Sequence, residues 1–158
     1  MKKDDIDAFS RRIACANASE IIVILYEMFF TYESDGIEAM KKHDWDAYID
    51  NMRQCSLVLE HLKNALDFQY NIANNLYALY NYAEVSISKA IYSRKEEYID
   101  AADRVMKPLW EAFVEVAKSD DSDSVMQNSQ KVTAGLTYGR NNLNESYDDG
   151  NLNRGFLV

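Results

Sequence analysis

Residues 16–30 read ANASEIIVILYEMFF, and this stretch marks the start of the first long helix of the chain. Asn17 is a favourable N-cap residue, and Glu20 stands three positions later, as a capping box requires. The apolar residues that follow recur at the 3.6-residue period of an amphipathic helix, which we expect to run from Ala18 to about Lys42. The expected core stripe of this helix is Ala18, Ile22, Leu25, Phe29, Gly36 and Met40.

Three further helical patterns follow the first, with short connections between them. They cover about 45–66, where Asp44 supplies the N-cap, then about 72–92 and about 95–117. Short loops make successive long helices antiparallel, so the sequence predicts an all-α, up-down four-helix bundle. Residues 4–14 favour a short N-terminal helix before the bundle. The expected core residues include, on the third helix, Ile72, Leu76, Leu79, Ala83, Ile87 and Ala90, and at the end of the fourth, Phe113 and Val116.

Glycine and proline divide the chain into two parts. Pro108 is the only proline, and four of the five glycines lie between Gly135 and Gly155. We therefore expect one helical domain over 1–118 and a polar, irregular tail over 119–158, which begins with SDDSDS. Two interpretations of the tail remain open: a disordered appendage, or a segment that docks on the bundle in competition with a ligand. The second rests on its recurring apolar residues, Leu136, Tyr138, Leu143, Tyr147, Leu152, Phe156 and Leu157.

The charge of the chain excludes some classes of partner. Its formal net charge is −9 at pH 7, which argues against binding to nucleic acid or to anionic membrane surfaces, because both require clustered Lys and Arg. No apolar run approaches the roughly 20 residues of a membrane span. The N-terminal MKKDDIDAF also lacks the apolar core of a secretion signal. Cys15 and Cys55 stand far apart without metal-binding spacing, so we expect small buried thiols in a reducing cytoplasm.

No residue pattern indicates catalysis, a cofactor or a metal site. A four-helix bundle can hold a di-metal carboxylate site, but that site requires Glu-x-x-His pairs. Here Met40 and Val58 occupy the positions three residues before His43 and His61. The chain also lacks a phosphate-binding loop and any local signature of a Cys/His nucleophile. The sequence therefore favours a protein that is not an enzyme.

Aromatic residues exceed what the predicted core can use. NLYALYNY, at residues 75–82, has three tyrosines within six positions. At about 100° per residue, Tyr80 lies at the edge of the core stripe, whereas Tyr77 and Tyr82 stand on opposite flanks. Such a wide apolar arc fits a central helix with neighbours on both sides, or an exposed groove for an apolar helix of a partner. The first helix shows the same excess in a second apolar line of Val23, Tyr26, Phe30 and Ile37.

Two of these stretches, ANASEIIVILYE (16–27) and NLYALYNYA (75–83), resemble the best-marked segments of the FliS family of flagellar export chaperones. The dipeptide at 66–67, Leu-Asp, and LWEAF (109–113) resemble two further family motifs, in the same order and on the corresponding helices. The similarity extends over about 16–117. The departures from the family pattern, which indicate a divergent branch, are Asn17, Ala18, Met28, Val85, Ser86 and Pro108.

The resemblance implies a cytoplasmic chaperone that binds the disordered C-terminal segment of flagellin in apolar grooves, prevents premature polymerisation and docks at the flagellar export gate. A client that orders on binding loses chain entropy, so it needs a large apolar contact. The candidate client-binding residues are Val23, Tyr26, Phe30, Tyr77, Tyr80 and Tyr82. The family's N-terminal segment can cover a groove, a role for which the candidates here are Ile6, Phe9 and Ile13.

A second interpretation is a helical adaptor or regulator that binds another amphipathic client helix, which the same aromatic residues would serve equally well. Under either interpretation the exposed apolar grooves make weak self-association plausible.

Overall fold

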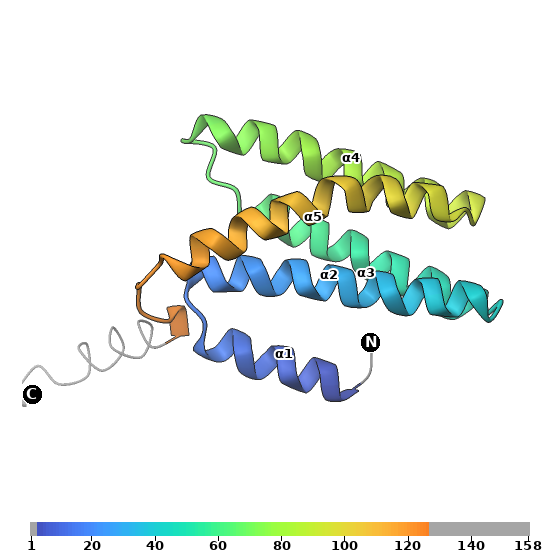
Figure 1. Ribbon diagram of the computed structural model, residues 1–158, viewed down its shortest axis with the longest axis horizontal. Helices are drawn as coiled ribbons and strands as arrows, with labels where there is room; N and C mark the ends of the chain where they lie inside the picture. Colours follow the sequence, from blue (N-terminus) through green and yellow to red (C-terminus); the bar gives the residue numbers. More distant parts are fainter. Residues whose placement is uncertain (1–2, 127–158) are drawn as a thin grey trace, which may run out of the picture.

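Five helices form the fold of the computed structural model, which describes residues 3–126. Four of them pack as an antiparallel up-down bundle, and α1 lies along α2 on the outside (Figure 1). No strand occurs within 3–126. The predicted bundle with an N-terminal helix is confirmed, whereas the apolar tail residues from Leu136 onward lie outside the described part. The helices are α1 Lys3–Cys15, α2 Ala18–Lys41, α3 Trp45–Asn64, α4 Asn71–Ser93 and α5 Glu96–Lys118.

Side-chain caps fix the first residues of α2 and α3. The Asn17 side chain accepts a hydrogen bond from the Glu20 backbone N–H at 2.8 Å, and the Glu20 carboxylate accepts one from the Asn17 N–H at 2.9 Å. This is the predicted capping box. Asp44 likewise accepts a hydrogen bond from the Ala47 N–H at 3.1 Å. Both predicted helix starts are therefore confirmed.

A glycine permits the close approach of α2 and α3. Gly36 is buried, and a Cβ atom at this position would overlap the terminal methyl group of Met52 on α3. Met52 is fully buried, so it has little room to move. The single glycine of the helical body therefore lies where α3 fills the space of a side chain.

One tyrosine ring joins three helices in the core. Tyr26 of α2 is fully buried, and its hydroxyl lies 2.7 Å from that of Tyr80 on α4. Its ring centroid is 5.6 Å from that of Phe113 on α5. Burial raises the pKa of Tyr26 and of Tyr80, so both hydroxyls stay neutral. For Tyr26, the central-helix interpretation is the one observed.

The expected core stripe of α2 is partly wrong. Ala18 is exposed, while Ile24 and Ala39, which were not expected in the core, are buried. The reason is that α2 packs against α1, α3 and α5, so more than one stripe is covered. The expectation for Cys15 is also wrong, since this thiol is exposed; Cys55 is buried as expected, and both are free.

The first residues after α5 return to the start of α2. The Asn17 side-chain amide donates a hydrogen bond to the Asp120 carbonyl at 2.9 Å. The Val125 backbone N–H donates to the Ala16 carbonyl at 3.1 Å. Asp120 also accepts a hydrogen bond from the Ser19 hydroxyl. The described beginning of the predicted tail is thus bound to the junction between α1 and α2.

One carboxyl group is buried between α2 and α5. Glu33 is 5% exposed, and its Oε1 atom has no hydrogen-bond partner within the described residues. Burial, followed by a hydrogen bond and the negative charge of Asp103, raises the pKa of Glu33 to about 9; Lys107 acts in the opposite direction. Glu33 therefore carries its proton at neutral pH.

We expect Tyr26→Phe and Tyr80→Phe each to lower the free energy of unfolding by about 1–2 kcal/mol, because each leaves the other buried hydroxyl without its partner. The double variant should lose clearly less than the sum of the two, which urea unfolding measures as a coupling energy. Tyr92→Phe, at a position 89% exposed, is the control and should change nothing. Strictly additive losses would contradict a direct hydrogen bond between the two rings.

The raised pKa of Glu33 predicts a pH-dependent effect of Glu33→Gln. Between its ordinary value of 4.5 and about 9, the folded state keeps a proton that the unfolded state releases. Stability from this group is therefore present at low pH and is lost as pH rises through that window. At pH 8 the variant should unfold with a free energy on the order of 2 kcal/mol higher than the parent chain.

The gain should shrink towards zero below pH 4.5, where both states hold the proton. Urea unfolding at four pH values measures the difference, with the exposed Glu60→Gln as the control. A gain that does not vary with pH would show that Glu33 is ionised in the folded chain.

Candidate apolar binding surface

The N-terminal half of α4 leaves core-type residues uncovered. Ile72 and Leu79 lie on the same helical face as Ala83 and Ala90, at about 100° per residue. The two alanines are fully buried, but Ile72 is 64% exposed and Leu79 is 37% exposed. The prediction that both residues belong to the core is therefore wrong. We call Ile72, Leu79 and the partly buried Leu76 the open α4 face.

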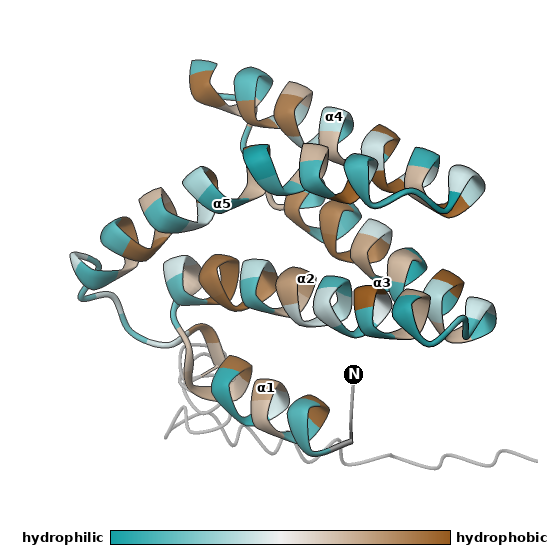
Figure 2. Ribbon diagram, turned by 45° about the vertical axis from the view of Figure 1, so that its right-hand side comes forward, coloured by the Kyte–Doolittle hydropathy of each residue, from teal (hydrophilic) through white to brown (hydrophobic). Residues whose placement is uncertain are grey.

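The path of α5 explains this exposure. Figure 1 shows α5 beside the C-terminal half of α4 and then crossing towards the start of α2. Tyr26 contacts both Tyr80 and Phe113, so its ring lies between the first half of α4 and the second half of α5. Val116, near the end of α5, is 53% exposed for the same reason, although we expected it in the core. Figure 2 shows that apolar residues continue along α4 to its N-terminal end.

A first pocket lies where α1, α2 and α5 meet, with a volume of about 460 Å³. Val23 and Ile24 of α2 form part of its wall, opposite Val114 and Ala117 of α5. Its rim is charged, and the remaining lining residues are Arg12, Cys15, Ala16, Glu20 and Lys118.

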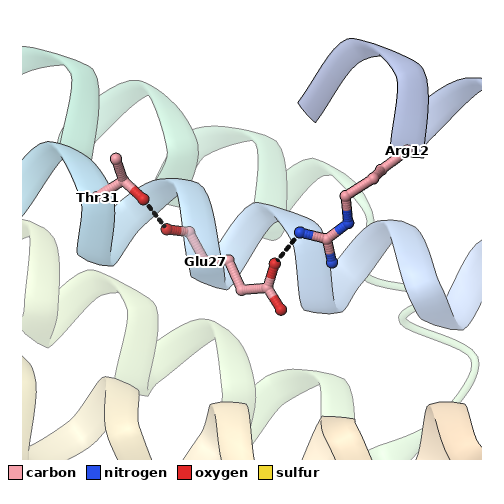
Figure 3. A network of polar contacts seen from close by, with 3 residues as sticks. All are labelled: Arg12, Glu27 and Thr31. Carbon is pink, nitrogen blue, oxygen red and sulfur yellow. Dashed lines mark hydrogen bonds and ion pairs between the residues drawn. The ribbon is translucent and has the colours of Figure 1, made fainter. Parts of the chain in front are cut away.

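An ion pair links α1 to α2. Arg12 forms an ion pair with Glu27, whose backbone carbonyl accepts a hydrogen bond from the Thr31 hydroxyl at 2.8 Å (Figure 3). The Arg12 guanidinium also lies over the Phe9 ring, 5.8 Å from its centroid. Of the three residues expected to cover a groove, Phe9 and Ile13 are partly buried, whereas Ile6 is exposed.

A second pocket lies between α2 and α5, with a volume of about 680 Å³. Its apolar wall includes Phe30, Ile37 and Trp110. The rings of Phe30 and Trp110 meet edge to face, with centroids 5.8 Å apart. This pocket has an acidic rim and base, which distinguishes it from the first.

The structure does not bring the six candidate client-binding residues together on one surface. Val23 lines the first pocket and Phe30 the second. Tyr26 and Tyr80 are in the core, where a client cannot reach their rings.

The remaining two candidates lie on separate sides of α4. Tyr77 packs edge to face on Phe68, with ring centroids 5.9 Å apart. Tyr82 lines a third pocket, of about 320 Å³, between α4 and α5. Ile72 and Leu79 were missed as surface residues because helical periodicity shows a stripe but not whether a neighbour covers it.

The described residues offer little that would support catalysis. Within 3–126, no three His, Cys, Asp or Glu side chains are grouped so that they could bind a metal ion. Burial raises the pKa of the Cys55 thiol, which opposes formation of a nucleophilic thiolate. In the same range, no helix combines the length and the apolar character needed to cross a bilayer.

Comparison with known proteins agrees with the helical architecture. No curated protein sequence matches the chain. The family model described as Flagellar protein FliS matches residues 7–120, which include every helix of the bundle and most of α1. Membership of this family implies the role of a flagellin export chaperone, which is not an enzymatic one. The chain belongs to the FliS family of flagellar proteins.

Proposed function

We propose that this protein acts in the cytoplasm by binding the disordered C-terminal segment of flagellin on its apolar surface, which prevents premature polymerisation. It then delivers the client to the flagellar export gate. The observation that carries this proposal is the open α4 face, where Ile72 and Leu79 are exposed on the side of the helix that is buried further along. A client helix with apolar residues at matching spacing would complete the bundle there.

Two pockets and two exposed rings offer further apolar contact to the same client. We assign this contact to Val23 in the first pocket, to Phe30 in the second, and to the exposed rings of Tyr77 and Tyr82. Tyr26 and Tyr80 are hydrogen-bonded to each other in the core beneath the apolar surface. They would contact a client only if the bundle opened. Several separated contacts suit a segment that wraps around the bundle and loses chain entropy as it orders.

We further propose that α1 partly covers the first pocket when no client is bound. Phe9 and Ile13 are only partly buried, and half of the Arg12 side chain in the Arg12–Glu27 ion pair is exposed, which keeps this pair weak. Because few contacts hold α1 in place, a client can displace it at a small cost in free energy. Free chains with uncovered apolar surface would also self-associate weakly.

A helical adaptor for a different amphipathic client is the alternative function. The open α4 face favours it equally, because an exposed apolar stripe does not identify its partner. A flagellin C-terminal peptide discriminates between the two. If circular dichroism shows an intact bundle and the peptide does not bind, the flagellin assignment fails and the adaptor remains.

Replacing the open α4 face by polar residues should weaken binding of the flagellin peptide. We expect Ile72→Ser with Leu79→Ser to reduce the affinity measured by calorimetry roughly tenfold to a hundredfold, since each loses part of a buried apolar contact. Both side chains are exposed, so the variant should stay folded. Tyr92→Ser, also on α4 and exposed, is the matched control. An unchanged affinity would show that the client binds elsewhere.

Weakening the contacts of α1 should have the opposite effect. Phe9→Ser with Ile13→Ser should strengthen binding of the same peptide about threefold or more, because the cover leaves the first pocket more readily. Ala8→Ser, at an exposed position of the same helix, is the control. A loss of affinity would show instead that α1 forms part of the client site.

A further inference from the structure

The base of the second pocket contains three buried polar atoms that lack hydrogen-bond partners within the described residues. They are Glu33 Oε1 on α2, and Asp103 Oδ1 and Trp110 Nε1 on α5. Buried polar groups are nearly always paired, since leaving one unpaired costs about 1–3 kcal/mol. Three in one pocket, with Glu33 itself 5% exposed, therefore indicate a place for a ligand.

The charges around this pocket are predominantly negative. Lys107 bonds the other carboxylate oxygen of Asp103, which leaves Oδ1 available. Lys41 is the second basic residue of the lining, and both lysines are exposed at the rim. Against these two stand four acidic residues that carry charge, Glu27, Glu38, Asp103 and Glu111, and the protonated Glu33. Glu27, Glu38 and Asp103 each have a basic partner, so the lining carries more acidic than basic groups but its strongest unpaired feature is the buried pair of Glu33 and Asp103.

We propose that this pocket receives an arginine side chain of a partner polypeptide. A guanidinium is planar and carries five N–H donors, so it can bond Glu33 Oε1 and Asp103 Oδ1 together. Its flat face can pack on the aromatic wall that Phe30 provides. The proposal does not depend on flagellin, because it defines the partner only by its arginine.

The indole group favours a polypeptide over a free cation. Trp110 Nε1–H is a donor, and a guanidinium has no acceptor to offer it. A backbone carbonyl beside the arginine supplies that acceptor, so one short segment of chain satisfies all three atoms. The open, partly apolar pocket also has room for the residues that flank the arginine.

Entry of the guanidinium should release a proton. In the free chain, Glu33 holds a proton beside the Asp103 carboxylate; when the cation binds, that proton passes to solvent and Glu33 becomes a carboxylate. The other groups that face Glu33 are Asp100 and Lys107 on α5 and Cys55 on α3. Cys55 stays neutral at these pH values, and Lys107 is already charged, so Glu33 is the group that loses the proton.

The test is a titration of the isotope-labelled full chain with N-acetyl-arginine-N-methylamide, followed by NMR. The chain has two tryptophans, so Trp110 reports on the pocket, while Trp45, which packs on Tyr48 and His43 at the start of α3, serves as the internal control. We expect a saturable shift of the Trp110 indole resonance alone. The affinity should rise about three- to tenfold per pH unit between pH 6 and 8, as release of one proton requires.

The matched neutral probe, N-acetyl-citrulline-N-methylamide, should shift neither resonance. Glu33→Gln should bind the arginine probe at least tenfold more weakly while unfolding no more easily than the parent chain, and Glu60→Gln should bind as the parent does. The proposal is overturned if citrulline acts like arginine, if Trp110 does not respond, or if Glu33→Gln leaves the affinity unchanged. An affinity for the arginine probe that does not change with pH would also overturn the proposal, since Glu33 and Asp103 would then not bind the guanidinium.

Discussion

The position of the Tyr26 ring is the constraint on which the rest of the structure depends. Its hydroxyl bonds Tyr80 on α4 and its face meets Phe113 on α5, so a side chain of α2 fills the centre of the bundle. The ring thus lies between the second half of α5 and the first half of α4. The exposure of Ile72 and Val116 follows from that separation and not from any polar character of the two helices.

Local chemistry explains why the helices could be predicted closely. Asn17 with Glu20, and Asp44, cap their helices through contacts within three residues, which the sequence alone displays. Coverage of a helix face is a tertiary property. Ile72 and Leu79 continue the stripe of Ala83 without a break, and only the path of α5 makes them surface residues. Tyr26, a candidate for client binding, lies in the core instead. The sequence left this open, because a wide apolar arc fits a central helix and an open groove equally.

The acid pair of the second pocket could not be found in the sequence for a related reason. Glu33 and Asp103 are seventy residues apart and belong to helices whose other acidic residues are exposed or partly exposed. Helical periodicity assigns such residues to outward faces. Packing of α5 on α2 brings the two carboxyls together and buries one of them, which raises the pKa of Glu33. Val23 and Phe30, by contrast, were assigned to binding from their apolar periodicity, and each lines a pocket.

An exposed apolar face gives affinity but little discrimination, because any amphipathic helix can cover it. A buried acid pair supplies the missing selectivity. An apolar side chain that entered the second pocket would leave Glu33, Asp103 and Trp110 unpaired, at a cost that a cationic side chain avoids. The open α4 face therefore contributes to the affinity for any apolar helix, and the acid pair contributes to the selection of one partner over another. The instability that Glu33 causes in the free chain is the physical reason why the pocket favours a partner that brings a positive charge.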